Sequence, residues 1–181
     1  MKTIIINDEN INEQFTKKKL KSRAIFINSS NEILVANYGG VFLLPGGSID
    51  GKETPDKTIY RELKEEIGVD MKPEQLKPFV KVRYFQPDYP ERNGNTINRL
   101  AVTYYYLGHI ENISDERDLT ENEKNGGFTV EFYSINQILE ILNNKKSDNP
   151  RRLYFDRELQ AVIDYYKERL QVKENTEIII S

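Results

Sequence analysis

Three glutamates near the middle of the chain stand at a spacing that suits metal binding. Glu62, Glu65 and Glu66 occupy positions i, i+3 and i+4, so a helix would place their side chains on one face. Like charges held this close destabilise a helix by about 0.2–0.5 kcal/mol per pair, and a bound cation would offset the repulsion. Carboxylate oxygens suit the hard cations Mg²⁺ and Mn²⁺. The spacing therefore predicts a divalent-metal site that a substrate phosphate would complete.

The flanking residues predict the helix that these acids need. Thr54 is followed by proline, a pair typical of an N-cap and a first helical position, and Gly68 is typical of a helix end. Between them Ile59, Leu63 and Ile67 recur every four residues and form one apolar stripe. The acids would thus stand beside the face by which the helix packs on a sheet.

A glycine turn and an ion pair are expected in front of the acids. The sequence Pro-Gly-Gly at 45–47 predicts a sharp turn, which by itself would be an ordinary tight turn. Glu53 lies just before the N-cap and Arg61 just before the acids. A charge-assisted pair between these two side chains would orient the acids without reacting.

These residues together resemble a known motif. Residues 47–69 resemble a complete Nudix box, G-x5-E-x7-R-E-U-x-E-E-x-G-U, in which U is aliphatic. Gly47, Glu53, Arg61 and Gly68 fill the fixed positions around the acids. An acidic helix face alone is most often solvated surface, but the glycine, glutamate and arginine in register favour the motif.

The resemblance implies both a fold and a reaction. The fold would be an α/β/α sandwich with a mixed β-sheet between helices, in which water attacks phosphorus in a nucleoside diphosphate linked to another group. By position, Glu65 would be a further metal ligand or the base that activates water, and Glu53 would hold Arg61. The implied metal ligands are the Gly46 carbonyl, Glu62, Glu65 and Glu66, and the implied catalytic residues inside the box are Glu53, Arg61, Glu62 and Glu65.

Further site residues are expected outside the box. Nudix relatives differ in which external acid acts as base or extra ligand; the acidic segment 114–124 offers Glu121 and Glu123, and Glu123 is preferred. Guanidinium groups near strand ends could bind phosphates bidentately. The Phe85 or Tyr89 ring could stack on a base, although core packing is the more common role for a ring such as Phe85. The substrate-binding candidates are Arg23, Arg83, Arg99 and Phe85.

The rest of the chain predicts a single domain of strands and helices. Residues 1–21 read as an N-terminal arm and residues 150–181 as a C-terminal helix and tail, with the helix at about 152–173. The isoleucine runs at 4–6 and 178–180 predict short edge strands that pair with each other or with another chain. A second helix is expected at 135–142, a long polar loop at 86–98, and strands at 23–28, 32–37, 41–44, 79–85, 99–110 and 128–134.

Composition excludes several classes of partner. With 26 basic and 29 acidic side chains the net charge is −3, so a nucleic acid partner is not expected. No apolar run reaches the roughly 20 residues that cross a bilayer, and the chain start is too polar for a signal peptide. The absence of cysteine agrees with a reducing compartment. A cytoplasmic monomer or homodimer is expected.

The expected function is metal-dependent hydrolysis of a phosphoric anhydride, with Mg²⁺ or Mn²⁺ as cofactor. The substrate would be a small nucleotide of the ADP-ribose, nucleotide-sugar or nucleoside-triphosphate type; Pro78 and Pro87 are poorly placed for the proline associated with ADP-ribose hydrolysis. A nucleotide-sensing module without turnover is the alternative, which the intact acids disfavour. RNA-end processing is disfavoured by the net negative charge.

Overall fold

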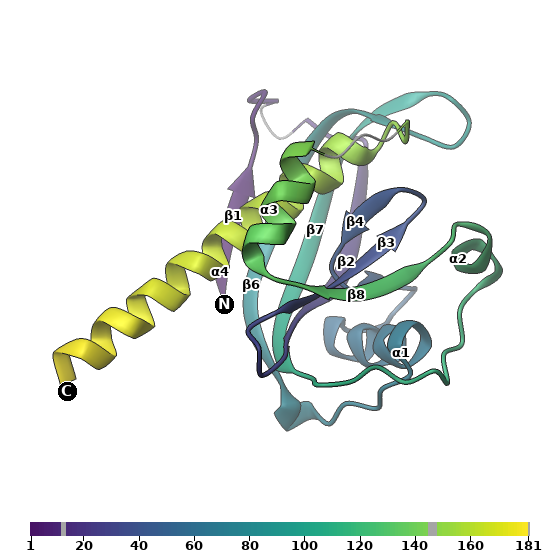
Figure 1. Ribbon diagram of the computed structural model, residues 1–181. Coiled ribbons are helices and arrows are strands. Elements are labelled where there is room, and N and C mark those ends of the chain that lie inside the picture. Colours follow the sequence, from purple (N-terminus) through teal and green to yellow (C-terminus); the bar gives the residue numbers. More distant parts are fainter. Residues whose placement is uncertain (12–13, 145–147, 181) are drawn as a thin grey trace.

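A mixed β-sheet forms the centre of the molecule, with helices on both of its faces (Figure 1). The computed structural model describes residues 1–11, 14–144 and 148–180. The strand order is β1-β6-β7-β2-β3-β4, while β5 pairs with β2 and β8 with β3. The strands are β1 (Lys2–Ile6), β2 (Lys17–Ile27), β3 (Ile33–Tyr38), β4 (Val41–Leu43), β5 (Gly46–Ser48), β6 (Leu76–Pro90), β7 (Thr96–His109) and β8 (Thr129–Tyr133).

Strand β2 is the axis of the sheet. It runs parallel to β7 over its whole length, from the pair Lys17 and Arg99 to the pair Ile27 and His109. Strand β7 is antiparallel to β6, whose other edge is paired in parallel with β1. Strand β5 pairs antiparallel with the middle of β2, where Gly46 lies opposite Arg23. The glycine turn is therefore fixed to the central strand.

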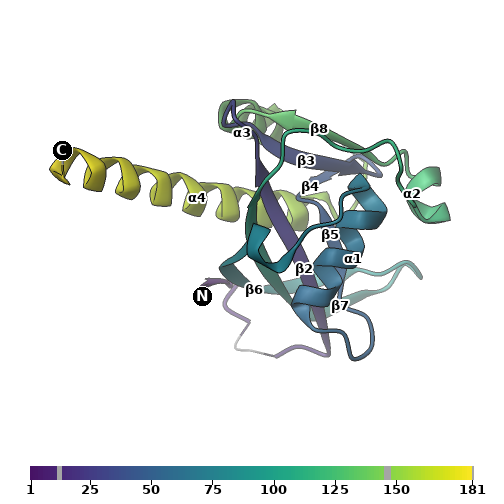
Figure 2. The same ribbon diagram turned by 90° about the horizontal axis from the view of Figure 1, so that it is seen from below.

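The helices divide between the two faces of the sheet (Figures 1 and 2). Because strand side chains alternate, Ala24 and Phe26 of β2 pack in the apolar cluster of one helix, whereas Ile25 packs in the opposite cluster. The first cluster holds α1 (Pro55–Ile67), and the second holds α3 (Ile135–Asn144) and α4 (Arg152–Ile180). This confirms the predicted α/β/α sandwich.

Helix α1 begins and ends where its sequence predicts. The Thr54 side chain accepts a hydrogen bond from the Lys57 amide, and Pro55 occupies the first turn. Gly68 closes the helix in the left-handed region at φ 67°, which favours glycine. Ile59 and Leu63 are buried completely. Local capping and apolar periodicity agree here, so the helix was predictable from sequence.

The predicted loop at 86–98 is wrong, because strands β6 and β7 continue through most of it. Gln86 pairs with Arg99 and Tyr89 with Ile97, with a register shift between Gln86 and Tyr89. Only residues 91–95 remain as the connection between the strands. Polar composition indicated a loop, but strand pairing with the neighbouring β7 extends the hairpin.

The chain termini also differ from expectation. Residues 2–6 form β1 and residues 17–21 begin β2, so most of the expected arm belongs to the sheet. Helix α4 continues to Ile180, and the predicted strand at 178–180 is therefore wrong. No glycine or proline interrupts the chain within α4, so nothing stops the helix before these isoleucines. Part of the acidic segment likewise forms a short helix, α2 (Glu121–Asn125).

Helix α4 has two different halves. Leu159, Val162, Ile163 and Tyr166 are buried against the sheet, whereas the positions from 171 to 179 are exposed. The C-terminal half projects away from the body of the molecule (Figure 1). Among the described helices, none combines the length and apolarity that crossing a membrane requires.

We predict that Ile163→Ala costs about 2–5 kcal/mol of unfolding free energy, because it leaves a cavity between α4 and the sheet. Val172→Ala, on the projecting half of the same helix, should change it by less than about 0.5 kcal/mol. Equilibrium urea unfolding of both variants measures the difference. Equal costs at the two positions would contradict the packing described.

Candidate active site

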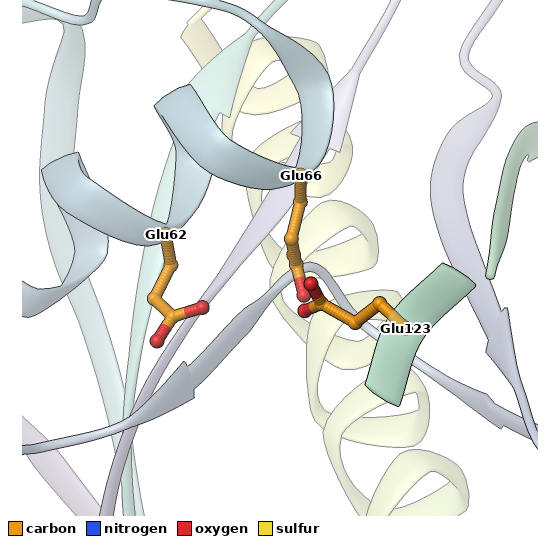
Figure 3. Close-up of side chains that lie close together, drawn as sticks. All are labelled: Glu62, Glu66 and Glu123. Carbon is orange, nitrogen blue, oxygen red and sulfur yellow. The ribbon is translucent and has the colours of Figure 1, made fainter. Parts of the chain in front are cut away.

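Three carboxylates converge beside the glycine turn. Glu62 and Glu66 lie one turn apart on α1, and Glu123 reaches them from α2 (Figure 3). One ligand atom from each of the three lies within 4.8 Å of the other two. We call these three residues the carboxylate cluster. A helix spacing alone could not have shown its third member, since Glu123 is far away in sequence.

Burial makes the charge of this cluster costly. The Glu66 side chain is only 3% exposed, and this burial raises the pKa of its carboxyl to about 8 despite the nearby Arg23 guanidinium and a hydrogen bond from the Gly46 amide. Burial likewise raises the pKa of Glu62. Carboxyl groups whose ionised form is disfavoured by desolvation and by each other gain stability from a bound cation. Their oxygen-only donor set suits a hard divalent ion.

The glycine turn lets the backbone approach these acids. A Cβ at Gly47 would lie 2.3 Å from Glu62 Oε1, and one at Gly46 would lie 2.2 Å from the Ser22 carbonyl oxygen. The Gly46 amide donates to Glu66 Oε2 at 2.8 Å, and its carbonyl accepts from Arg23 at 3.1 Å. A carbonyl oxygen has two lone pairs, so the expected ligand role of Gly46 is compatible with the Arg23 bond.

Arg61 connects the acids to the loop in front of the helix. Its guanidinium binds Glu53 bidentately, with both N···O distances at 3.0 Å. The Arg61 and Thr58 hydrogen bonds lower the pKa of Glu53 to about 2. The same guanidinium donates to Glu62 at 2.9 Å and to Glu65 at 3.4 Å. Arg61 thus positions Glu62 toward the cluster.

Glu65 occupies a different place from the other two helix acids. It is partly exposed and contacts Arg61, and it is not part of the carboxylate cluster. The spacing predicted three glutamates on one face, but Glu62 and Glu66 point into the cluster while Glu65 contacts Arg61 outside it. Glu65 remains a candidate ligand or base at the solvent side of this arginine.

A cavity of about 790 Å³ opens beside the glycine turn, and seven of its nineteen lining residues are cationic. It borders Ser48 of the glycine turn and Gly126 at the end of α2, so both elements that position the acids reach it. We call it the cationic cavity. Its charged lining residues are Lys17, Lys19, Lys21, Arg23, Glu91, Arg92, Arg99 and Arg151.

Two of the four expected substrate-binding residues lie in this cavity. Arg23 and Arg99 line it, whereas Arg83 and Phe85 do not. Phe85 is buried in a small separate cluster, and the Arg83 guanidinium lies 5.7 Å from the centre of its ring. Residues 83 and 85 have the opposite strand parity to Tyr84, which packs in the cluster of α4.

Several cavity residues were missed by sequence reasoning. Lys17, Lys19 and Lys21 fall in the predicted arm, but they belong to β2. Their alternate spacing is typical of one face of a strand. The centre of the Tyr89 ring lies 3.3 Å from Arg99 Cζ and 5.4 Å from Arg151 Cζ, so this ring contacts cations of the cavity. No local signal marked Arg151, since its approach depends on how α4 packs.

The chain belongs to the Nudix family, since the NUDIX domain profile matches residues 18–157. This span contains the box and the whole carboxylate cluster. The resemblance seen at residues 47–69 is thereby confirmed.

Two curated relatives have stated activities. The chain is similar to the 8-oxo-dGTP diphosphatase of Proteus vulgaris, at 37% identity over 62 residues, which are 30% of this chain and 55% of the relative. It is also similar to the 8-oxo-dGTP diphosphatase of Escherichia coli strain K12, at 36% identity over 78 residues, covering 39% and 59%. The chain thus spans little more than half the length of these relatives.

Solved structures share the fold. One is the NUDIX domain of Shewanella oneidensis NrtR complexed with ADP ribose, at 18% identity, covering 90% of this chain and 94% of that one with a TM-score of 0.54. Another is a NUDIX hydrolase from Nitrosomonas europaea, at 16% identity, covering 80% and 90% with a TM-score of 0.51. At these identities the likeness shows the fold alone.

The raised pKa of Glu66 predicts a pH-dependent stability of the metal-free protein. Between the ordinary value of 4.5 and about 8, the folded state holds a proton on Glu66 that the unfolded state has lost. The contribution of this group is complete below the unfolded pKa and is lost as the pH rises through the folded pKa. Glu66→Gln cannot titrate, so the Tm of the variant relative to wild type should increase across this window. Thermal unfolding in EDTA at several pH values measures it, and parallel curves would contradict the assignment.

Proposed function

We propose that this chain is a hydrolase that cleaves a phosphoric anhydride in a small nucleotide, with Mg²⁺ or Mn²⁺ as cofactor. The observation that carries the proposal is the carboxylate cluster, held beside the glycine turn at the edge of a cationic cavity. The cluster supplies ligands for the cation, and the cavity supplies charge for phosphates. Neither feature alone would indicate this chemistry.

The donor set suits the proposed cofactor. Glu62 and Glu66 would hold the cation, with the Gly46 carbonyl and Glu65 as further ligands. When bound, a divalent cation neutralises phosphate oxygens and makes a nearby water more acidic. Arg61, fixed by Glu53, keeps Glu62 directed toward the site.

Two carboxylates could accept the proton of the attacking water. Glu65 is engaged by Arg61, whereas Glu123 lies within the cluster. Thr120 holds Glu123 Oε2 through its amide at 2.7 Å and its hydroxyl at 2.8 Å. We favour Glu123 as the base, because its carboxylate lies within 4.8 Å of the Glu62 and Glu66 oxygens and Thr120 fixes its orientation.

The cationic cavity would bind the substrate phosphates. Arg23 joins the cavity to the Gly46 carbonyl, and Arg99 lines the same cavity from β7. The names of the two curated relatives, both 8-oxo-dGTP diphosphatases, support a nucleoside diphosphate linked to a further group as substrate class. A cytoplasmic monomer or homodimer acting on a small molecule, with no nucleic acid or membrane partner, remains our proposal for its setting.

Glu66→Gln should lower metal-dependent turnover by at least about 100-fold, because it removes a ligand charge at nearly constant size. The assay measures phosphate release from a panel of nucleoside diphosphates linked to a further group, with Mg²⁺ or Mn²⁺. A parallel assay in EDTA gives the metal-free rate. Glu168→Gln, at an exposed position of α4, is the matched control. Tight nucleotide binding by wild type without product would instead indicate the sensing module.

Glu123→Gln tests the acid outside the box. We expect a fall in kcat of about 10²–10⁴-fold, the range of a general base. Glu121→Gln on the same short helix should leave kcat within about twofold, because the exposed Glu121 side chain, among the described residues, forms an ion pair with Lys124 alone. An equal effect of both substitutions would mean that α2 contributes through its fold and not through the Glu123 carboxylate.

A further inference from the structure

A row of cations follows one face of β2 into the cationic cavity. Lys17, Lys19, Lys21 and Arg23 occupy alternate positions and all line the cavity. With roughly 3.3 Å per strand residue, the row extends over about 20 Å. It begins beside the β6–β7 turn and ends at the glycine turn, where Arg23 contacts Gly46. The row therefore continues well beyond the carboxylate cluster.

The charge of this cavity is unbalanced. Seven of its lining side chains are cationic and one, Glu91, is anionic, in a chain whose net charge is −3. Lys17 lies 3.3 Å from Glu91. In the described part of the chain, none of the other cavity cations forms a salt bridge. A pyrophosphate held by metal at the cluster would neutralise only one end of this row.

Lys21 lacks an acceptor for its ammonium group. Its side chain is 6% exposed and lies 4.9 Å from the ring centre of Phe155. Across residues 1–11, 14–144 and 148–180, no side chain or carbonyl accepts a hydrogen bond from Lys21 Nζ, and desolvation lowers the pKa of this lysine to about 7. The buried Glu158 opposes this shift electrostatically, and the Nζ atom itself opens to the cavity. A phosphate in the cavity would supply the missing acceptor.

We propose that the substrate carries at least one phosphate group besides those of the scissile anhydride, and that Lys19 and Lys21 bind it. This inference rests on the proposed function and makes these lysines determinants of specificity. The extra phosphate could continue the anhydride chain or form a monoester on a sugar. Both sources present the same dianionic chemistry to the lysines.

The kinetic test uses substrates that differ by one phosphate. The pairs are a nucleoside triphosphate against its diphosphate, and ADP-ribose against its phosphomonoesters on the adenosine ribose and on the terminal ribose. Wild type should prefer the phosphorylated member of at least one pair by about tenfold or more in kcat/KM. The pair that shows the preference identifies the source of the phosphate.

Lys19→Met and Lys21→Met should remove most of that preference, mainly through KM. Lys18→Met is the matched control, because Lys18 is on the same strand with the opposite parity and outside the cavity. Its preference should equal that of wild type. Turnover of all the pairs without preference, or an equal loss in the Lys18 variant, would overturn the inference.

Binding without metal separates this inference from the proposed function. In EDTA, calorimetry should show inorganic tripolyphosphate bound about tenfold more tightly than pyrophosphate by wild type and by Lys18→Met, and not by Lys19→Met or Lys21→Met. Lysine-dependent binding without any turnover would contradict the proposed hydrolase function and support the extra-phosphate site. Turnover with no difference between these probes would overturn only the extra-phosphate site.

Discussion

The repulsion among buried carboxylates is the constraint around which the structure is arranged. Glu62 and Glu66 enter a desolvated site where burial raises the pKa of both. The fold holds them there through the packing of α1, the Gly46 amide and the Arg61 clamp. Arg61 and the Gly46 amide restrict the movement of these acids and compensate their charge only in part, since the pKa of both carboxyls stays raised. The proposed affinity for a divalent cation would follow from this restriction, because folding has already brought the ligands together.

The cationic cavity lies close to the acids and carries the opposite charge. Arg23 links the two regions, since its guanidinium touches the Gly46 carbonyl while its backbone belongs to the strand that carries the lysines. The pairing of β5 with β2 fixes this neighbourhood. A phosphate compound that spans both regions would meet metal at one end and lysines at the other. Catalysis and recognition thus depend on a single strand pair.

Local signals predicted the parts of the site that lie within one helix and its loop. Thr54, Gly68 and the box spacing fixed α1, and Glu53 pairs with Arg61 as expected. Features set by tertiary packing could not be read in the same way. The lysine row needed the knowledge that residues 17–21 extend β2, and polar composition hid the strand character of residues 86–98. Glu123 was selected as a candidate acid, but only the path of the chain from β7 to β8 brings it to Glu66.

The short helix α2 links occupancy of the carboxylate cluster to local unfolding of the chain. A helix of five residues is too short to be stable by itself, so its order depends on the Thr120 and Glu123 capping box and on contacts such as Gly39 with Gly126. A water bound both to an ion on α1 and to Glu123 would act as a reversible crosslink between segments about sixty positions apart. Site occupancy and the local unfolding of residues 120–126 would then be linked equilibria, so that loading the site protects this segment from amide exchange.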